Sequence, residues 1–142
     1  MEMSASFKRE IGELADVFGL VESFFGGGGI DADKRFPIDL AVEEIFTNFV
    51  KYNPQGKGEI SIRLSLEGDE IKLAMIDPDA EPFDITQESP EVNVDQPLEE
   101  RTRGKLGIHL VKKMMDRVEY DHASGASTIT LYKRVERGHV RD

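Results

Sequence analysis

The chain has 142 residues, the size of one domain with a hydrophobic core of its own. Hydrophobic residues make up 39% and charged residues 32%, a balance that excludes a disordered chain. Because there is no cysteine, disulfides and thiolate metal sites are excluded as well. The formal net charge of −10 opposes binding to a polyanion such as DNA, whereas a small anionic ligand needs only a local basic pocket.

The sequence also indicates where the protein works. No apolar run approaches the ~20 residues that span a bilayer, and the residues before Phe7 lack the basic and then apolar layout of a secretory signal. We therefore expect a cytoplasmic protein that binds neither membranes nor nucleic acid. One basic cluster is a candidate anion pocket, and it consists of Arg101, Arg103, Lys105, Lys112 and Lys113.

Two amphipathic helices are predicted in the first half of the chain. The first covers residues 7–25, where apolar residues recur at spacings of three and four after the candidate N-cap Ser6. Residues 26–29 are four glycines that stop this helix. We interpret them as a flexible connector, because the Gly-Lys-Ser/Thr of a phosphate-binding loop is absent. The second helix covers residues 37–52 and ends before Pro54.

The second half begins with a hairpin. Alternating apolar residues predict strands over residues 60–66 and 71–75, joined by a turn at Gly68-Asp69. Residues 77–104 lack periodicity and are rich in proline and acidic residues, which is typical of a functional lid.

One more helix and two short strands complete the chain. The helix is predicted over residues 106–117 and the strands at residues 118–120 and 128–132. Helices on one face of a mostly antiparallel, mixed sheet are the simplest packing for these elements. The sequence therefore predicts one α+β domain over residues 1–142, a two-layer α/β sandwich.

The second predicted helix carries a carboxylate and a carboxamide one turn apart. Glu44 and Asn48 share one side of this helix, at the edge of its apolar stripe. An Asn oxygen suits Mg²⁺, and a Glu accepts a proton from an attacking hydroxyl or water. Taken alone, a solvated helix edge explains the pair better.

Two later segments are suited to binding a nucleotide. Asp77 ends a buried strand, where a carboxylate can accept a hydrogen bond from an exocyclic amino group such as that of adenine. An Asx turn that merely ends the strand explains the same residue. Residues 101–111 run from a basic, glycine-containing loop into a helix, whose backbone N–H groups attract anions. An ordinary loop with a close-packing glycine is the alternative there.

The order of these segments resembles the GHKL superfamily of gyrases and histidine kinases, and within it the anti-sigma-factor serine kinases. Glu44-Ile45-Phe46-Thr47-Asn48 is similar to their N box, and Asp77 with Pro82-Phe83-Asp84 to their G1 box. Gly104-x-Leu106-Gly107-Ile108-x-Leu110-Val111 is similar to the G2 box, and Met115-Asp116-x-Val118-x-Tyr120 continues as in that family. The likeness covers residues 7–133.

The resemblance implies a Bergerat, or histidine-kinase-like ATPase, fold and a role for each matched residue. Asn48 would ligate Mg²⁺ on ATP, Glu44 would be the general base toward a serine of a partner protein, and Asp77 would bind adenine N6. Residues 78–103 would form the ATP lid. The phosphates would lie against the backbone of two glycines and one of two basic side chains, namely Gly104, Gly107, Arg103 and Lys105.

The resemblance also implies partners. The phosphate acceptor would be a STAS-domain anti-anti-sigma protein, a sigma factor is a second candidate partner, and the family commonly forms homodimers. One alternative is a degenerate GHKL domain that binds a partner protein with little or no nucleotide turnover. Another is an ATPase module detached from a sensor kinase. It is disfavoured because no phospho-accepting helix precedes the domain and the three histidines are scattered.

Three departures from the family pattern bear on activity. Asp79 stands where the G1 box usually has glycine, and we expect Asp to tolerate the left-handed backbone such a turn needs. Lys105 stands where the G2 box often has glycine. The sequence before Phe7 is so short that we expect the family's first strand to be short or missing.

Overall fold

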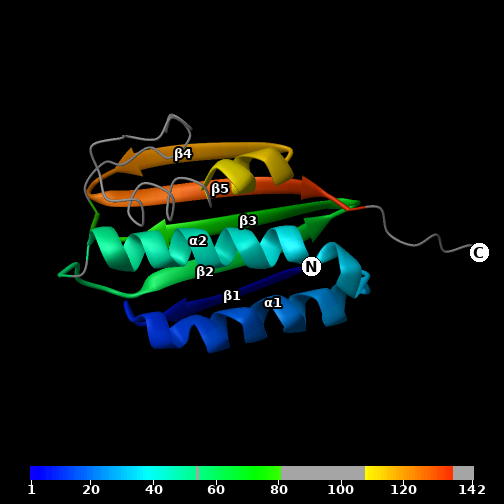
Figure 1. Cartoon of the computed structure of the whole chain (residues 1–142), viewed down its shortest axis with the longest axis horizontal. Coiled ribbons are helices and arrows are strands. Elements are labelled where there is room, and N and C mark those ends of the chain that lie inside the picture. Colours follow the sequence, from blue (N-terminus) through cyan, green and yellow to red (C-terminus); the bar gives the residue numbers. More distant parts are fainter. Residues whose placement is uncertain (54, 81–107, 136–142) are drawn as a thin grey trace, which may run out of the picture.

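A five-stranded antiparallel sheet carries the helices on one face (Figure 1). The computed structural model describes residues 1–53, 55–80 and 108–135. The strands are β1 (Glu2–Phe7), β2 (Ile60–Glu67), β3 (Glu70–Asp77), β4 (Arg117–Ala123) and β5 (Ala126–Arg134). The helices are α1 (Leu14–Gly28), α2 (Phe36–Tyr52), the short 3₁₀ turns η1 (Ile11–Glu13) and η2 (Ala32–Lys34), and an α-helix over residues 108–114.

The strands lie in the order β1-β2-β3-β5-β4, and every pairing between them is antiparallel. This confirms the predicted α+β sandwich with helices on one face. β3 lies at the centre of the sheet, and its last residue, Asp77, pairs with Ser127 of β5. The end of β3 is therefore held between β2 and β5.

The core lies between the sheet and the helices. On α2 the buried residues recur at spacings of three and four, and on β2 and β3 they alternate, as the two periodicities require. The ring of Phe7 meets that of Phe46 edge to face at 6.4 Å between centroids, which joins β1 to α2. Ile108 and Val111 bring the helix over residues 108–114 (yellow in Figure 1) into the same cluster.

The predicted first helix was wrong at its N-terminal end. Residues 2–7 form β1, which pairs with β2 from Glu2 opposite Ser65 to Phe7 opposite Ile60. Ser6 does not cap a helix, because its hydroxyl bonds that of Ser61 across the strands at 3.2 Å. The physical reason is that Met3, Ala5 and Phe7 alternate toward the core, while the backbone of this segment pairs with the otherwise open edge of β2. The first strand of the fold is thus not missing, and with six residues it is short, the shortest strand of the sheet.

The four glycines are not a flexible connector. The first three belong to the last turn of α1, and Gly29 is its C-cap, with a left-handed backbone at φ 64°. The N–H of Gly29 bonds the carbonyl of Gly26, and that of Ile30 bonds the carbonyl of Phe25. Glycine takes this conformation without the steric cost of a Cβ, so the run ends the helix in a defined geometry.

The other predicted elements are confirmed with changed bounds. The second helix and the hairpin are α2, β2 and β3, while β4 and β5 are longer than expected. β4 begins at Arg117 and takes the last residue of the helix predicted over residues 106–117. The start of that helix and most of the predicted lid, residues 81–103, lie outside the described residues. Within the described part of the chain, no helix is long and apolar enough to cross a membrane.

Candidate functional site

Glu44 and Asn48 lie side by side along α2, on the flank of its buried stripe, and both side chains are half-buried. Burial raises the pKa of the Glu44 carboxyl above its ordinary value, and the charge of neighbouring Glu43 raises it further. Among the described residues, neither Glu44 nor Asn48 has a side-chain hydrogen bond. The burial of Glu44 distinguishes it from its exposed neighbour Glu43 on the same helix.

Asp77 takes the fourth inward position of β3, after Ile71, Leu73 and Met75. It is 0% exposed, which is rare for a carboxylate without a partner. The partner is Arg9: Nη1 donates to Oδ2 at 2.9 Å, and Nη2 donates to Oδ1 at 2.8 Å. The two side chains form a bidentate ion pair in which Arg9 is 6% and Asp77 1% exposed.

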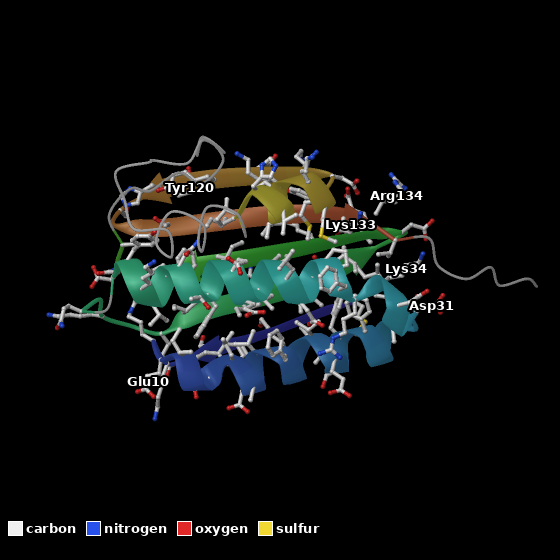
Figure 2. The ribbon with its side chains drawn as sticks, viewed as in Figure 1. Glu10, Asp31, Lys34, Tyr120, Lys133 and Arg134 are labelled. Atoms are coloured by element: carbon white, nitrogen blue, oxygen red, sulfur yellow. The ribbon has the colours of Figure 1, made fainter. Side chains whose placement is uncertain are left out.

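Arg9 also holds the loop between α2 and β2. Its Nη2 donates to the carbonyls of Lys57 and Gly58 at 3.2 and 3.3 Å. Its neighbour Glu10, just before η1, points outward (Figure 2), whereas the side chain of Arg9 is buried. Arg9 was not among the predicted site residues, because the helix predicted over residues 7–25 included it. The alternation of Met3, Ala5 and Phe7 is a weak signal of the strand that Arg9 follows.

Asp79 fits its turn without a left-handed backbone, so the tolerance expected of Asp is not needed there. In the described part of the chain, Ser124 is the only non-glycine residue with positive φ. The N–H of Asp79 donates to Asp77 Oδ1 at 3.1 Å, which is the Asx turn considered as the alternative for Asp77. Asp79 Oδ2 accepts the N–H of Lys57 at 2.6 Å, and its carbonyl accepts from Asn53 Nδ2.

The contact between Asn53 and Asp79 brings the end of α2 to the end of β3. Asn53 follows α2 directly, and a helix rises about 1.5 Å per residue. Asn48 thus lies about 7.5 Å back along the axis, and Glu44, about 13.5 Å back, is at the middle of α2. The three predicted side chains are therefore presented by two adjoining elements, with Asn48 closer than Glu44 to the end of the helix that contacts β3. Lys34 and Arg134 lie at the opposite end from Glu10 (Figure 2).

The start of the predicted lid is fixed to the β4–β5 hairpin. The N–H of Ala80 donates to the carbonyl of Gly125 at 2.9 Å, and the carbonyl of Ala80 lies 2.8 Å from His122 Nε2. The remaining predicted site residues, Arg103, Gly104, Lys105 and Gly107, lie outside the described residues. Of the basic cluster, Lys112 and Lys113 lie on the described helix.

A helix-covered antiparallel sheet with a Glu/Asn helix beside a strand-end Asp defines an ATPase domain of the histidine-kinase type. The family model described as the histidine kinase-like ATPase domain matches residues 7–133. The chain belongs to this family.

Curated relatives of this chain are bacterial. It is 30% identical over 115 residues to the serine-protein kinase RsbW of Bacillus velezensis, covering 77% of this chain and 71% of that protein. It is 32% identical over 123 residues to RsbW of Bacillus licheniformis, covering 80% of this chain and 73% of that protein.

A solved structure shows the same fold. The RsbU and RsbW domains of Rv1364c from Mycobacterium tuberculosis match 95% of this chain with a TM-score of 0.66 and 16% sequence identity. The match covers 32% of that chain, so the present protein spans about a third of its length.

Proposed function

We propose that this protein is an Mg-ATP-dependent serine kinase. It phosphorylates a STAS-type anti-anti-sigma protein, thereby regulates a sigma factor, and works as a cytoplasmic homodimer. The observation that carries the proposal is the half-buried pair on α2, where Glu44 has a raised pKa one turn from Asn48. Membership of the histidine kinase-like ATPase family and the similarity to serine-protein kinases named RsbW support it.

The donor set fits Mg²⁺ with a nucleotide. Among the described residues there is no group of three or more His, Cys, Asp or Glu that could hold a metal. A single Asn oxygen suits Mg²⁺, which commonly takes one or two protein ligands together with phosphates and waters. Asn48 would hold the ion, whose chemistry when bound is to neutralise charge on the phosphates. Lys105 or Arg103 would contribute positive charge at the same phosphates.

Glu44 would accept the proton of the attacking serine hydroxyl. A general base works best when its pKa lies near the working pH, and burial moves the pKa of Glu44 in that direction. Asp77 would receive the exocyclic amino group of adenine, and the backbone at Gly104 and Gly107 would approach the phosphates.

One observation favours the degenerate alternative, a protein-binding domain with little turnover. Arg9 occupies both oxygens of Asp77, the carboxylate that would recognise the base. Asp79 argues the other way. Its carboxylate accepts a backbone N–H from Lys57, so the charge that replaces the usual glycine is partly neutralised by the turn.

Calorimetry with a non-hydrolysable ATP analogue and Mg²⁺ tests the site. We expect binding by the wild type, and a loss of about 10- to 100-fold in affinity for Asn48→Ala, since a hydrogen bond or ligand to a charged group contributes about 1.5–3 kcal/mol. Glu43→Ala, an exposed position on the same helix, is the matched control. No binding by the wild type at millimolar nucleotide would favour the degenerate alternative.

A further inference from the structure

The buried pair of Arg9 and Asp77 has a role beyond charge neutralisation. We propose that Arg9 is a positioning residue for base recognition: it fixes the Asp77 carboxylate so that one acceptor position of Oδ2 is left for the exocyclic amino group of adenine. This inference rests on the proposed function, in which Asp77 receives the base. Arg9 itself would not touch the nucleotide.

Counting the acceptor positions of Asp77 shows what remains for a ligand. A carboxylate offers about four lone-pair positions, two on each oxygen. Oδ1 accepts from Arg9 Nη2 and from the N–H of Asp79, which uses both of its positions. Oδ2 accepts only from Arg9 Nη1 among the described residues. Within the described part of the chain, one acceptor position therefore remains, and it is on Oδ2.

The alternative is that Arg9 blocks the site and leaves when a nucleotide binds. Its departure would break four hydrogen bonds, the two to Asp77 and those to the carbonyls of Lys57 and Gly58. Separating a buried ion pair leaves two uncompensated charges, and this costs more than one hydrogen bond from a base to a carboxylate returns. The balance keeps Arg9 in place, and other atoms that cover Asp77 must move instead.

The guanidinium geometry matters as well as the charge. Arg9 bridges two elements. Its guanidinium donates to both oxygens of Asp77, and Nη2 also donates to the carbonyl of Lys57 in the loop before β2. Its Cζ lies so close to Gly56 that a Cβ there would come within 2.8 Å of it. A lysine offers one compact charge and no fork, so it could neutralise Asp77 without fixing the plane of the carboxylate.

A fixed, ionised acceptor discriminates between bases. It accepts the N–H of adenine N6 and repels the carbonyl oxygen that hypoxanthine carries at the same position. If the carboxylate can rotate, Oδ2 is no longer held in line with the N–H of adenine N6. The hydrogen bond that favours adenine then weakens, and the preference for adenine over hypoxanthine falls even where overall binding survives. The ratio of adenine to hypoxanthine affinity is therefore a readout that a merely structural ion pair would not change.

The test compares Mg²⁺ complexes of non-hydrolysable ATP and ITP analogues on the wild type, Arg9→Lys and Arg9→Ala. We expect the wild type to prefer the adenine analogue and both variants to lose about tenfold of that preference, the equivalent of about 1.4 kcal/mol. Arg63→Ala is the matched control, because Arg63 pairs with Glu2 in an exposed salt bridge. Thermal unfolding first establishes that each variant is folded.

Two results would overturn the proposal. An unchanged preference in folded Arg9→Lys and Arg9→Ala would make the pair structural only, and tighter adenine binding by Arg9→Ala would make Arg9 a block. If neither wild-type analogue binds, the proposed function fails and this inference with it.

A measurement on the wild type does not depend on the variants folding. The guanidinium nitrogen resonances of Arg9 should stay distinct when the ATP analogue is added, because the paired fork cannot rotate freely. Their collapse to an averaged signal on nucleotide binding would show that Arg9 leaves Asp77, contrary to the proposal.

Discussion

Burial raises the pKa of Glu44, and this has a consequence for stability that can be measured. The folded state binds the proton of this carboxyl more tightly than the unfolded state does. The contribution of Glu44 to stability therefore falls as pH rises through the range between its ordinary and its raised pKa. Below that range the carboxyl is protonated, and the free-energy cost of burying its charge is absent. Above that range the carboxylate is ionised in both states, and this cost is fully present.

We expect Glu44→Gln, which cannot ionise, to be more stable than the wild type at neutral pH. The difference should vanish at pH values below the ordinary carboxyl pKa, because both side chains are then uncharged. Urea unfolding at several pH values measures it, with Glu22→Gln, an exposed glutamate of α1, as the control. A wild type that is the more stable of the two at neutral pH would contradict the burial of an ionised Glu44.

At the residue scale, the sequence predicted the side chains of the site better than their partners. Glu44 and Asn48 could be found because a spacing of four residues puts them together on any helix. Asp77 could be found because it continues the alternation of a clear strand. Arg9 could not, since it lies 68 residues away from Asp77 and the pair forms only when β1 joins the sheet.

At the scale of the element, the end of α1 depends on the backbone of one glycine. Gly29 has φ 64°, and a Cβ added there would meet nothing within 4 Å. A substitution at Gly29 therefore tests backbone conformation without a steric clash. Gly19 is the matched position, since it lies within the same helix and its added Cβ would also meet nothing within 4 Å.

We expect opposite effects at the two positions. Gly29→Ala should lower the free energy of unfolding by about 1–2 kcal/mol, the cost of a left-handed backbone for a residue with a Cβ. Gly19→Ala should raise it by about 1 kcal/mol, because alanine is the better helix former. Urea denaturation of both variants measures these changes. Equal effects of the same sign would show that Gly29 is not a left-handed cap.

The elements themselves were predictable where their apolar pattern was strong. α2 and the β2–β3 hairpin carry long runs of large apolar residues at clear periods, so their existence and type followed from the sequence. In β1 the inward residues Met3 and Ala5 are weak signals, and Phe7 fits a helical stripe as well. Only pairing with the edge of β2 decides between strand and helix there.

At the scale of the whole molecule, the fold brings Asp77 and its partners together at one end of the sheet. The C-terminal end of α2, the end of β3 and the connection after β1 meet there through Asn53, Asp77 and Arg9. The net charge of −10 repels a polyanion, so a protein is a more suitable partner than a nucleic acid.

Transfer of radiolabelled phosphate from ATP to a cognate STAS-domain protein tests whether this protein is a serine kinase with Glu44 as its base. We expect the wild type to label a serine of the partner, and Glu44→Gln to bind nucleotide but to transfer phosphate about 10²- to 10⁴-fold more slowly, the usual contribution of a general base. Glu22→Gln, at an exposed position of α1, should transfer at nearly the wild-type rate. Equal transfer by the wild type and Glu44→Gln, or none by either, would contradict this expectation.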